Sequence, residues 1–448
     1  PRPWRSCVIP PGRRLCATTS NKPVMRYRLA LAVGRFIRRL ARARGGGSAF
    51  PGLVALRIDP QFLEHSIGRA PEGVMFVSGS NGKSTTTSMI VAILRAHGKR
   101  VFTNPAGSNL PQGLASAVLA DADPQGFLPA EVAVLEVDEA YGPHIARHIP
   151  PAHFVVTNLQ LDQLNRFGEP ERVWQMMREV AELTSSTLLV NRKEPALIAL
   201  GEGLDWLRVE TVDVAQSIVD GSGDAIGAAQ FFDKRAEAAV DEASVVTLEQ
   251  VDSRRAWVAN ESERYQVSLP DEGLHWAVDA TVALGACQML LGDQWSSERA
   301  IQALASLPIV YGRGETVSWK GVPITLLMQK NLPSMRANLS TLDAQPERVW
   351  VAVDEGTPDP SWIFDLDLGP LTTVDVLTGT KAHQWAMFLA YRGVTVRAVI
   401  EDTEDAMNFF ARAGTAPVTA IVNYEQMMTI RRLTGNKDLE ASVVSGQS

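Results

Sequence analysis

The chain has 448 residues, 45% of them hydrophobic and 21% charged, and it carries a formal net charge of −7. This length predicts two or three domains, the composition is typical of a globular protein, and the negative charge does not favour nucleic-acid binding. No apolar run approaches the roughly 18 residues of a membrane-spanning helix, so we expect a cytoplasmic protein. The three cysteines, Cys7, Cys16 and Cys287, form no C-x-x-C pair, and neither a disulfide framework nor structural zinc is expected.

The first segment, residues 1–48, predicts an unstructured leader followed by a basic helix. The leader, residues 1–24, is rich in Pro, Arg and Ser. Residues 25–44 contain seven arginines and no acid, with an apolar stripe at helical spacing formed by Leu29, Val33, Phe36, Ile37 and Leu40. Two interpretations of this stripe remain open: peripheral contact with the inner face of the cell membrane, or packing against its own domain or a partner. A GGGS run at 45–48 then ends the helix.

The strongest chemical pattern is VMFVSGSNGKSTTT at 74–87, which predicts a buried strand, a glycine turn and the start of a helix. Two glycines let backbone N–H groups face an anion, the lysine adds positive charge, and a hydroxyl after it can hold Mg²⁺. An ordinary turn that happens to contain GKS is the alternative. Full Walker spacing would need a glycine where Val77 stands. The predicted phosphate-binding residues are Gly79, Ser80, Asn81, Gly82, Lys83, Ser84 and Thr85.

Strands and helices alternate after this loop, with strands expected at 99–103, 132–137, 154–157 and 187–191 and helices at 83–97 and 273–290. Polar residues follow several of these strands, and the carboxyl ends of parallel strands meet at one edge of a sheet. Glu136 is the best candidate for a second Mg²⁺ contact beside Ser84, and a solvent-facing acid is the alternative. Asp162 either positions a substrate or phosphate group or begins a helix.

A junction is predicted at 307–316, where Arg313 lies between two glycines. This arginine could clamp a phosphate across a cleft, or it could be a hinge residue paired with Glu315. A second α/β pattern follows and predicts parallel strands joined by right-handed crossovers. Its strands are expected at 324–328, 349–353, 374–378, 394–400 and 418–422, and its helices at 381–391, 404–413 and 424–433.

Taken together, these motifs resemble the Mur ligase superfamily, and within it the MurT-type subunits of lipid II isoglutaminyl synthase. The resemblance runs from about residue 25 to near the C-terminus. It implies an α/β fold with a Mur-ligase-like central P-loop ATPase domain built on a parallel sheet, at 49–306, and a C-terminal Rossmann-like α/β domain, at 307–448. The segments that carry it are GSNGKSTTT at 79–87, TNPAGSNLPQG at 103–113, LEVDEA at 135–140, TNLQLDQLNRFGE at 157–169, KN at 330–331, DPSW at 359–362 and TGTKA at 378–382.

The resemblance implies a carbon–nitrogen ligase of peptidoglycan synthesis that uses ATP and Mg²⁺. It would amidate the D-glutamate α-carboxylate of the lipid II stem peptide to D-isoglutamine. Ammonia would come from a GatD-type glutaminase subunit bound as a heterodimer, and Asp359 would complete that partner's Cys–His triad. Residues implied to position the substrate are Asn104, Asn109, Asp162, Lys330 and Asn331.

The sequence departs from the family pattern in places. It lacks the four-cysteine zinc ribbon that is often inserted in the central domain, and Trp276 and Asp279 stand where two asparagines are usual near the nucleotide base. Two alternative functions therefore remain: a stand-alone Mur-type ligase that adds an amino acid, and a non-catalytic nucleotide-binding scaffold for the glutaminase.

Overall fold

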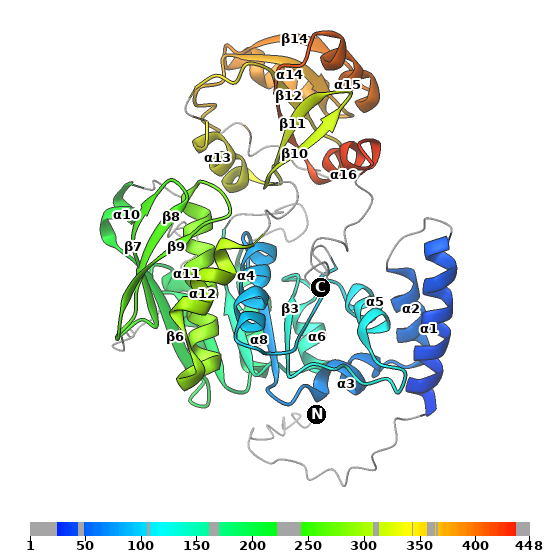
Figure 1. Cartoon of the computed structure of the whole chain (residues 1–448), viewed down its shortest axis with the longest axis vertical. Coiled ribbons are helices and arrows are strands. Elements are labelled where there is room, and N and C mark those ends of the chain that lie inside the picture. The colour runs from blue at the N-terminus through cyan, green and yellow to red at the C-terminus, as the bar shows by residue number, and fades with distance from the viewer. Residues whose placement is uncertain are drawn as a thin grey trace, which may run out of the picture.

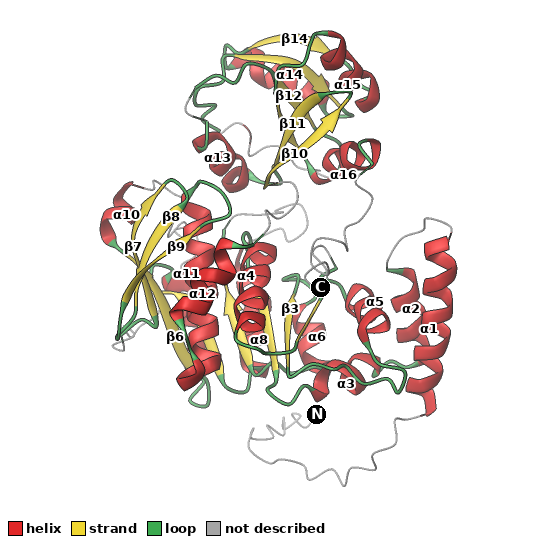
Figure 2. Cartoon of the chain, in the orientation of Figure 1, coloured by secondary structure: helices red, strands yellow, loops and turns green. Residues whose placement is uncertain are grey.

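Two β-sheets, each flanked by helices, make up the protein in this computed structural model (Figures 1 and 2). Strands between residues 74 and 268 form the first sheet, and strands between residues 313 and 422 form the second. The structure describes residues 25–43, 49–104, 108–160, 170–221, 243–307, 313–342, 344–355, 363 and 366–435.

The first sheet has nine strands in the order β2-β3-β1-β4-β5-β6-β7-β8-β9. The first seven strands in this order, from β2 through β1 to β7, run parallel, whereas β8 and β9 extend the sheet as an antiparallel hairpin. All five residues of β1 are buried, as expected for a parallel strand covered on both faces. The strands are β1 (Val74–Ser78), β2 (Val101–Thr103), β3 (Val132–Glu136), β4 (His153–Val156), β5 (Thr187–Asn191), β6 (Arg208–Val214), β7 (Val246–Asp252), β8 (Arg255–Ala259) and β9 (Arg264–Ser268).

Helices cover both faces of this sheet, and alternate β1 side chains enter different cores. Val74 and Phe76 join a core with α1, α5, α6 and α8, whereas Met75 and Val77 join a core with α4, α11 and α12. The α-helices are α1 (Met25–Ala43), α2 (Phe50–Ile58), α3 (Phe62–Ser66), α4 (Lys83–Ala96), α5 (Pro111–Asp121), α6 (Gly142–His148), α8 (Pro170–Leu183), α9 (Pro195–Ile198), α10 (Gln216–Gly221), α11 (Leu274–Leu291) and α12 (Ser297–Ala305), with 3₁₀ turns at Ile67–Arg69, Ala199–Gly201 and Gly292–Gln294.

Helix α11 bears on the expectation that no apolar run approaches the length of a membrane-spanning helix. Within the described part of the chain, the stretch Leu274–Gln294 is long and apolar enough to cross a membrane, with a mean hydropathy of 1.3. However, 67% of it is buried inside the protein, where it packs against α4 and the strands β5 to β7. This burial is what the core helix of a large α/β sheet shows, and the apolar composition reflects that position.

The second sheet has the order β10-β11-β15-β12-β13-β14, parallel except for the edge strand β10. Alternate residues of β12 again enter opposite cores, one with α13 and α14 and the other with α15 and α16. The elements are β10 (Arg313–Trp319), β11 (Val322–Met328), α13 (Leu332–Ser340), β12 (Val349–Ala352), β13 (Thr373–Thr378), α14 (Ala382–Tyr391), β14 (Thr395–Val399), α15 (Thr403–Arg412), β15 (Val418–Val422) and α16 (Tyr424–Leu433).

The elements named from the sequence agree with the structure to within two residues at each end. The sequence missed the strands β6 to β9, and it missed β10, which begins within the predicted junction and overlaps its last four residues, 313–316. Glu315 accepts from the guanidinium of Arg431 on α16, and its proposed hinge pairing with Arg313 stays a prediction. The Arg313 side chain and the leader, residues 1–24, lie outside the described residues.

Candidate functional site

The loop after β1 lies where the sheet order changes direction. Strand β1 is flanked by β3 and β4, so residues after these three strands meet at one edge. Gly79 has a φ of 135° and Gly82 a φ of 80°, values that side chains other than glycine rarely adopt. Gly82 caps the N-terminus of α4, and Lys83 is the first residue of that helix. The loop therefore presents backbone N–H groups and a helix N-terminus to one space, an arrangement that suits phosphate.

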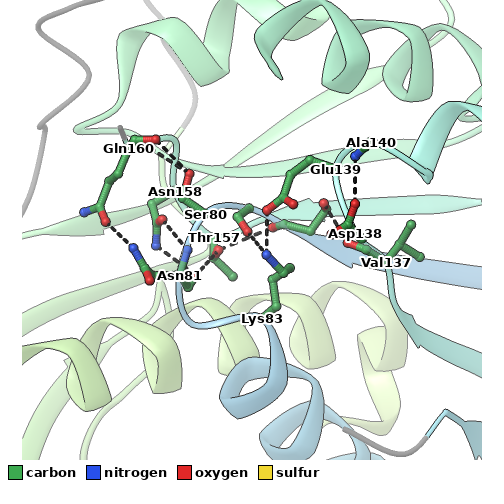
Figure 3. Close-up of polar contacts among 12 residues, drawn as sticks. Ser80, Asn81, Lys83, Val137, Asp138, Glu139, Ala140, Thr157, Asn158 and Gln160 are labelled. Atoms are coloured by element: carbon green, nitrogen blue, oxygen red, sulfur yellow. Dashed lines mark hydrogen bonds and ion pairs between the residues drawn. The ribbon is translucent and has the colours of Figure 1, made fainter. Parts of the chain in front are cut away.

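Residues after β4 hold the loop in place from one side (Figure 3). The Asn158 side chain accepts from the Asn81 N–H at 3.0 Å and donates to the Asn81 carbonyl at 3.1 Å. The Thr157 hydroxyl donates to the same carbonyl at 2.6 Å. The Ser80 hydroxyl accepts from the Gln160 N–H at 2.9 Å, and the side chains of Asn81 and Gln160 bond at 2.6 Å. The loop is thus fixed by neutral amides and hydroxyls before any ligand binds.

Lys83 is buried and pairs with an acid after β3. Its Nζ lies 2.5 Å from Oε1 of Glu139 and 2.5 Å from the carbonyl oxygen of Gly79 (Figure 3). The side chains of Lys83 and Glu139 are 10% and 6% exposed, so this ion pair is largely desolvated. An ammonium has three donors, and two of them go to these oxygens. A phosphate bound to Lys83 would therefore lie close to the Glu139 carboxylate.

Glu136 ends β3, and its backbone is clamped by the predicted substrate residue Asn104. The Asn104 side chain accepts from the Glu136 N–H at 2.9 Å and donates to the Glu136 carbonyl at 3.0 Å. Asn104 is buried and also donates to the carbonyl of Ser108, so its amide holds the strand end to the preceding loop. Asn109 follows closely, and its carbonyl accepts from the Asp138 N–H at 3.4 Å. The structure thus gives Asn104 a positioning role that the motif did not reveal.

The hydroxyls at the start of α4 suit phosphate and Mg²⁺. Ser84 is partly exposed, and the buried Thr85 hydroxyl has no hydrogen-bond partner among the described residues. A Cβ atom on Gly79 would lie 2.2 Å from the Thr157 hydroxyl, so the cradle admits only glycine there. No group of three or more His, Cys, Asp or Glu residues for a metal occurs in the described ranges. Mg²⁺ commonly uses one or two protein oxygens together with substrate phosphates, and the predicted role of Ser84 and Glu136 as its ligands stays a prediction.

The second sheet reaches this loop through the residues that follow β11. The Nζ of Lys330 donates to the Ser80 carbonyl at 2.6 Å, and the Asn331 amide lies 3.4 Å from the Asn81 side-chain oxygen. Asn331 also caps α13 through a capping box with Ser334, which fixes the backbone of this segment. Two predicted substrate residues are therefore brought to the phosphate loop from 250 residues away in the chain.

This combination of loop, lysine and strand-end acids matches one protein family. Residues 77–287 match the model of a protein family, the Mur ligase middle domain. The match covers a little less than half of the chain. The matched range covers the phosphate loop, Glu136, Glu139, and the residues after β4 that brace the loop.

Curated relatives agree with this assignment. The chain is 37% identical over 169 residues to the MurT subunit of lipid II isoglutaminyl synthase (glutamine-hydrolyzing) from Streptococcus pneumoniae, a match covering 37% of each protein. It is 30% identical over 172 residues to the corresponding subunit from Staphylococcus aureus strain COL, covering 38% of each. The matches therefore span less than two-fifths of the length of these relatives.

Solved structures show the same fold. MurF ligase from Thermotoga maritima in complex with ADP has a TM-score of 0.61 and 19% identity, covering 86% of this chain and 84% of that one. A MurF structure from Acinetobacter baumannii has a TM-score of 0.62 and 16% identity, covering 86% and 80%. The protein thus has a Mur-ligase-like α/β fold with two sheets.

Within the matched range, Asp279 of α11 lies against the phosphate loop. A Cβ atom on Gly82 would lie 2.2 Å from Oδ1 of Asp279, and this carboxylate is 4% exposed. Trp276, one turn earlier, is fully buried in the core shared with α4. The unusual acid is therefore close to the helix N-terminus at which phosphates would bind.

Three predicted residues are not placed by the structure. Asp162 and Asp359 lie outside the described residues, and only the backbone of Arg313 is described, at the start of β10. Their roles stay predictions. The converse holds for Glu139 and Gln160, which contact the loop although the sequence assigned no role to them. A signal for Glu139 was present, because acids after β3 were expected to converge on the loop.

Proposed function

We propose that the protein is the ATP-dependent subunit of an enzyme that amidates the D-glutamate α-carboxylate of the lipid II stem peptide. One observation carries this proposal: Lys83 and the glycines of the loop face one space, and Lys330 of the second sheet reaches the same loop. The proposal is supported by the names of the curated relatives and by the ADP complex of the MurF ligase, whose fold this chain shares.

The chemistry proposed for this site is phosphoryl transfer followed by amide formation. A substrate carboxylate oxygen attacks the γ-phosphorus of ATP, which gives an acyl phosphate and ADP. Ammonia then attacks the acyl carbon, the bond from carbon to the phosphate oxygen breaks, and phosphate leaves with a proton lost from nitrogen. Negative charge spreads over the transferring phosphoryl oxygens, so fixed positive charge and N–H donors lower the barrier.

The residues of the loop have distinct parts in this scheme. The N–H groups at the N-terminus of α4, from Gly82 on, would hold the phosphates, because those of Ser80 and Asn81 already donate to Asn158, and Lys83 would stabilise the charge on the transferring group. Ser84 and Glu136 would hold Mg²⁺, which neutralises phosphate charge when bound. Lys330 and Asn331 link the second sheet to the loop, so closure of the second sheet would orient the carboxylate against the γ-phosphate. Arg313 adds a further positive charge from the junction.

Ammonia in this proposal comes from a GatD-type glutaminase bound to the second-sheet part of the chain, at 307–448. Asp359 would accept a hydrogen bond from the partner's catalytic His and stabilise its protonated form. The relatives' names support a multi-subunit enzyme, because each is called a subunit of a glutamine-hydrolysing synthase. Because the proposed substrate is lipid-linked, we propose that the reaction takes place at the inner face of the cell membrane.

The test separates the two halves of the reaction. The purified complex with a GatD-type glutaminase is given lipid II and MgATP with either glutamine or ammonium chloride, and the product is identified by mass spectrometry. We expect Asp359→Ala to abolish glutamine-driven amidation and to keep ammonia-driven amidation. Equal glutamine-driven rates in the wild type and Asp359→Ala would remove the triad role. No amide product from either nitrogen source would overturn the whole proposal.

A second candidate is a non-catalytic scaffold that binds nucleotide and activates the glutaminase. The carboxylate of Asp279 against Gly82 favours it, because a negative charge at the phosphate site weakens nucleotide binding. The two candidates differ in what Lys83→Ala does to amidation. Loss of amidation with unchanged glutaminase activity supports catalysis by this chain, whereas unchanged amidation supports the scaffold.

A further inference from the structure

Helix α1 is apolar on two opposite sides, and the described part of the chain packs against only one of them. We propose that its uncovered side binds the surface of an anionic lipid bilayer. The proposal concerns lipid binding alone and does not rest on the amidation reaction. Figure 1 shows α1 at the outer edge of the protein, with α2 and α5 on its inner side.

The inner side of α1 is firmly attached to the first-sheet part of the chain. Tyr27 is buried, and its hydroxyl donates to the carbonyl of Gly126 at 2.5 Å. Gly34 lies directly against Leu119, since a Cβ atom there would be 2.7 Å from the leucine side chain. The Arg35 guanidinium donates to the Asp123 carbonyl at 3.0 Å, after the end of α5. The helix is thus held on its inner side by specific contacts.

The outer side carries large apolar residues instead. Successive residues of an α-helix lie about 100° apart around its axis. By this spacing four residues fall within about 60° of one another and roughly opposite Gly34. They are Met25, Leu29, Phe36 and Leu40, the outer stripe, with exposed fractions of 84%, 55%, 61% and 42%. Most of the stripe that the sequence predicted is therefore the exposed side, whereas small residues and Tyr27 form the packed side.

The positive charge of α1 favours an anionic lipid surface as the binding partner of the outer stripe. Helix α1 has six arginines and no acid, although the whole chain has a net charge of −7. Arg26, Arg28 and Arg39 are exposed, and the helical spacing puts them on the two flanks of the outer stripe. Neighbouring α2 also lacks acids. An apolar strip bordered on both sides by arginines fits lipid headgroups, with the apolar residues at the acyl boundary and the guanidinium groups on phosphates.

A vesicle co-sedimentation assay with the full chain tests this proposal. The probes are vesicles of phosphatidylcholine alone and of phosphatidylcholine mixed with phosphatidylglycerol. Each arginine near an anionic surface contributes about a fivefold gain in partitioning, so Arg26→Gln/Arg28→Gln/Arg39→Gln should bind about a hundredfold more weakly. Leu29→Ser/Phe36→Ser should lose more than about tenfold. The matched control is Met387→Ser/Tyr391→Ser on α14, two residues that are 76% and 84% exposed.

Thermal unfolding of every variant verifies the fold before binding is compared. The proposal predicts binding to phosphatidylglycerol vesicles that falls with added salt, is lost in both α1 variants, and is kept in the α14 control. Failure of the wild type to bind anionic vesicles would overturn it. Equal binding by the wild type and both α1 variants would also overturn it. So would a dimer, seen by analytical ultracentrifugation, that Leu29→Ser/Phe36→Ser dissociates, because a second copy would then cover the outer stripe.

Discussion

Substitution of Gly82 by alanine tests the geometry of the phosphate loop, because Gly98 provides a matched control at the other end of the same helix. Gly82 precedes α4 with a φ of 80°, and Gly98 follows it with a φ of 84°. Both positions have the left-handed backbone that disfavours alanine by about 1–2 kcal/mol. Their surroundings differ: a Cβ on Gly82 would lie 2.2 Å from the Asp279 carboxylate, whereas nothing lies within 4 Å of one on Gly98.

The structure predicts unequal losses of stability from these two substitutions. Asp279 would have to retreat by more than about 1 Å to reach van der Waals contact. Overpacking of this kind costs about 1–3 kcal/mol beyond the backbone term. The midpoint of thermal unfolding should therefore be lower in Gly82→Ala than in Gly98→Ala by roughly 2–12 °C, at about 2–4 °C for each kcal/mol.

A double-mutant cycle identifies the source of this difference. Asp279→Ala in the Gly82→Ala background should remove the overlap, so that the remaining loss equals that of Gly98→Ala plus that of Asp279→Ala alone. Differential scanning calorimetry of the five proteins gives the comparison. Equal midpoints for Gly82→Ala and Gly98→Ala would refute the contact between α11 and the loop. An additive cycle would refute it as well.

Further predictions concern charge and titration. Asp279→Asn should tighten MgADP binding about tenfold in calorimetric titration, because it removes a negative charge near the phosphates, whereas Asp271→Asn should not change it. Lys330→Met should lower kcat more than it raises KM for ATP, because it breaks the link between the second sheet and the loop, and Lys320→Met, an exposed control, should match the wild type. Burial lowers the pKa of His153 below its ordinary value of 6.5. The unfolded chain therefore binds the proton first, so stability should fall between about pH 7 and 5, and denaturant unfolding of His153→Gln should show a shallower fall.

The phosphate loop and most of the strands could be predicted from local sequence patterns. The glycines and the lysine act within one turn of chain, so their spacing alone predicts the loop. Buried parallel strands are short apolar runs, and β1, β3, β5 and β15 were visible for this reason. The hairpin of β8 and β9 was missed because its exposed residues break such runs, as the alternating burial of β9 shows.

Contacts made across the sheet could not be predicted in the same way. Sequence spacing puts Glu136 and Glu139 near the loop, but the turn after β3 decides which of them reaches Lys83. Asn158 and Gln160 are neutral amides without a charge pattern, so their bonds to Asn81 are visible only in three dimensions. The side of α1 that packs against the protein was not predicted, for a related reason. Small residues such as Gly34 pack closely, and a hydrophobic pattern gives them little weight.

The central claim is that this chain itself activates a carboxylate with ATP and joins it to ammonia. Its most direct test is amidation of lipid II by the purified chain with MgATP and ammonium chloride, without a glutaminase, followed by mass spectrometry. The account predicts a D-isoglutamine product, ADP formation that depends on lipid II, and a loss of at least about a hundredfold in rate for Lys83→Met. An undiminished rate in folded Lys83→Met, or a product that carries an added amino acid in place of the amide, would contradict it.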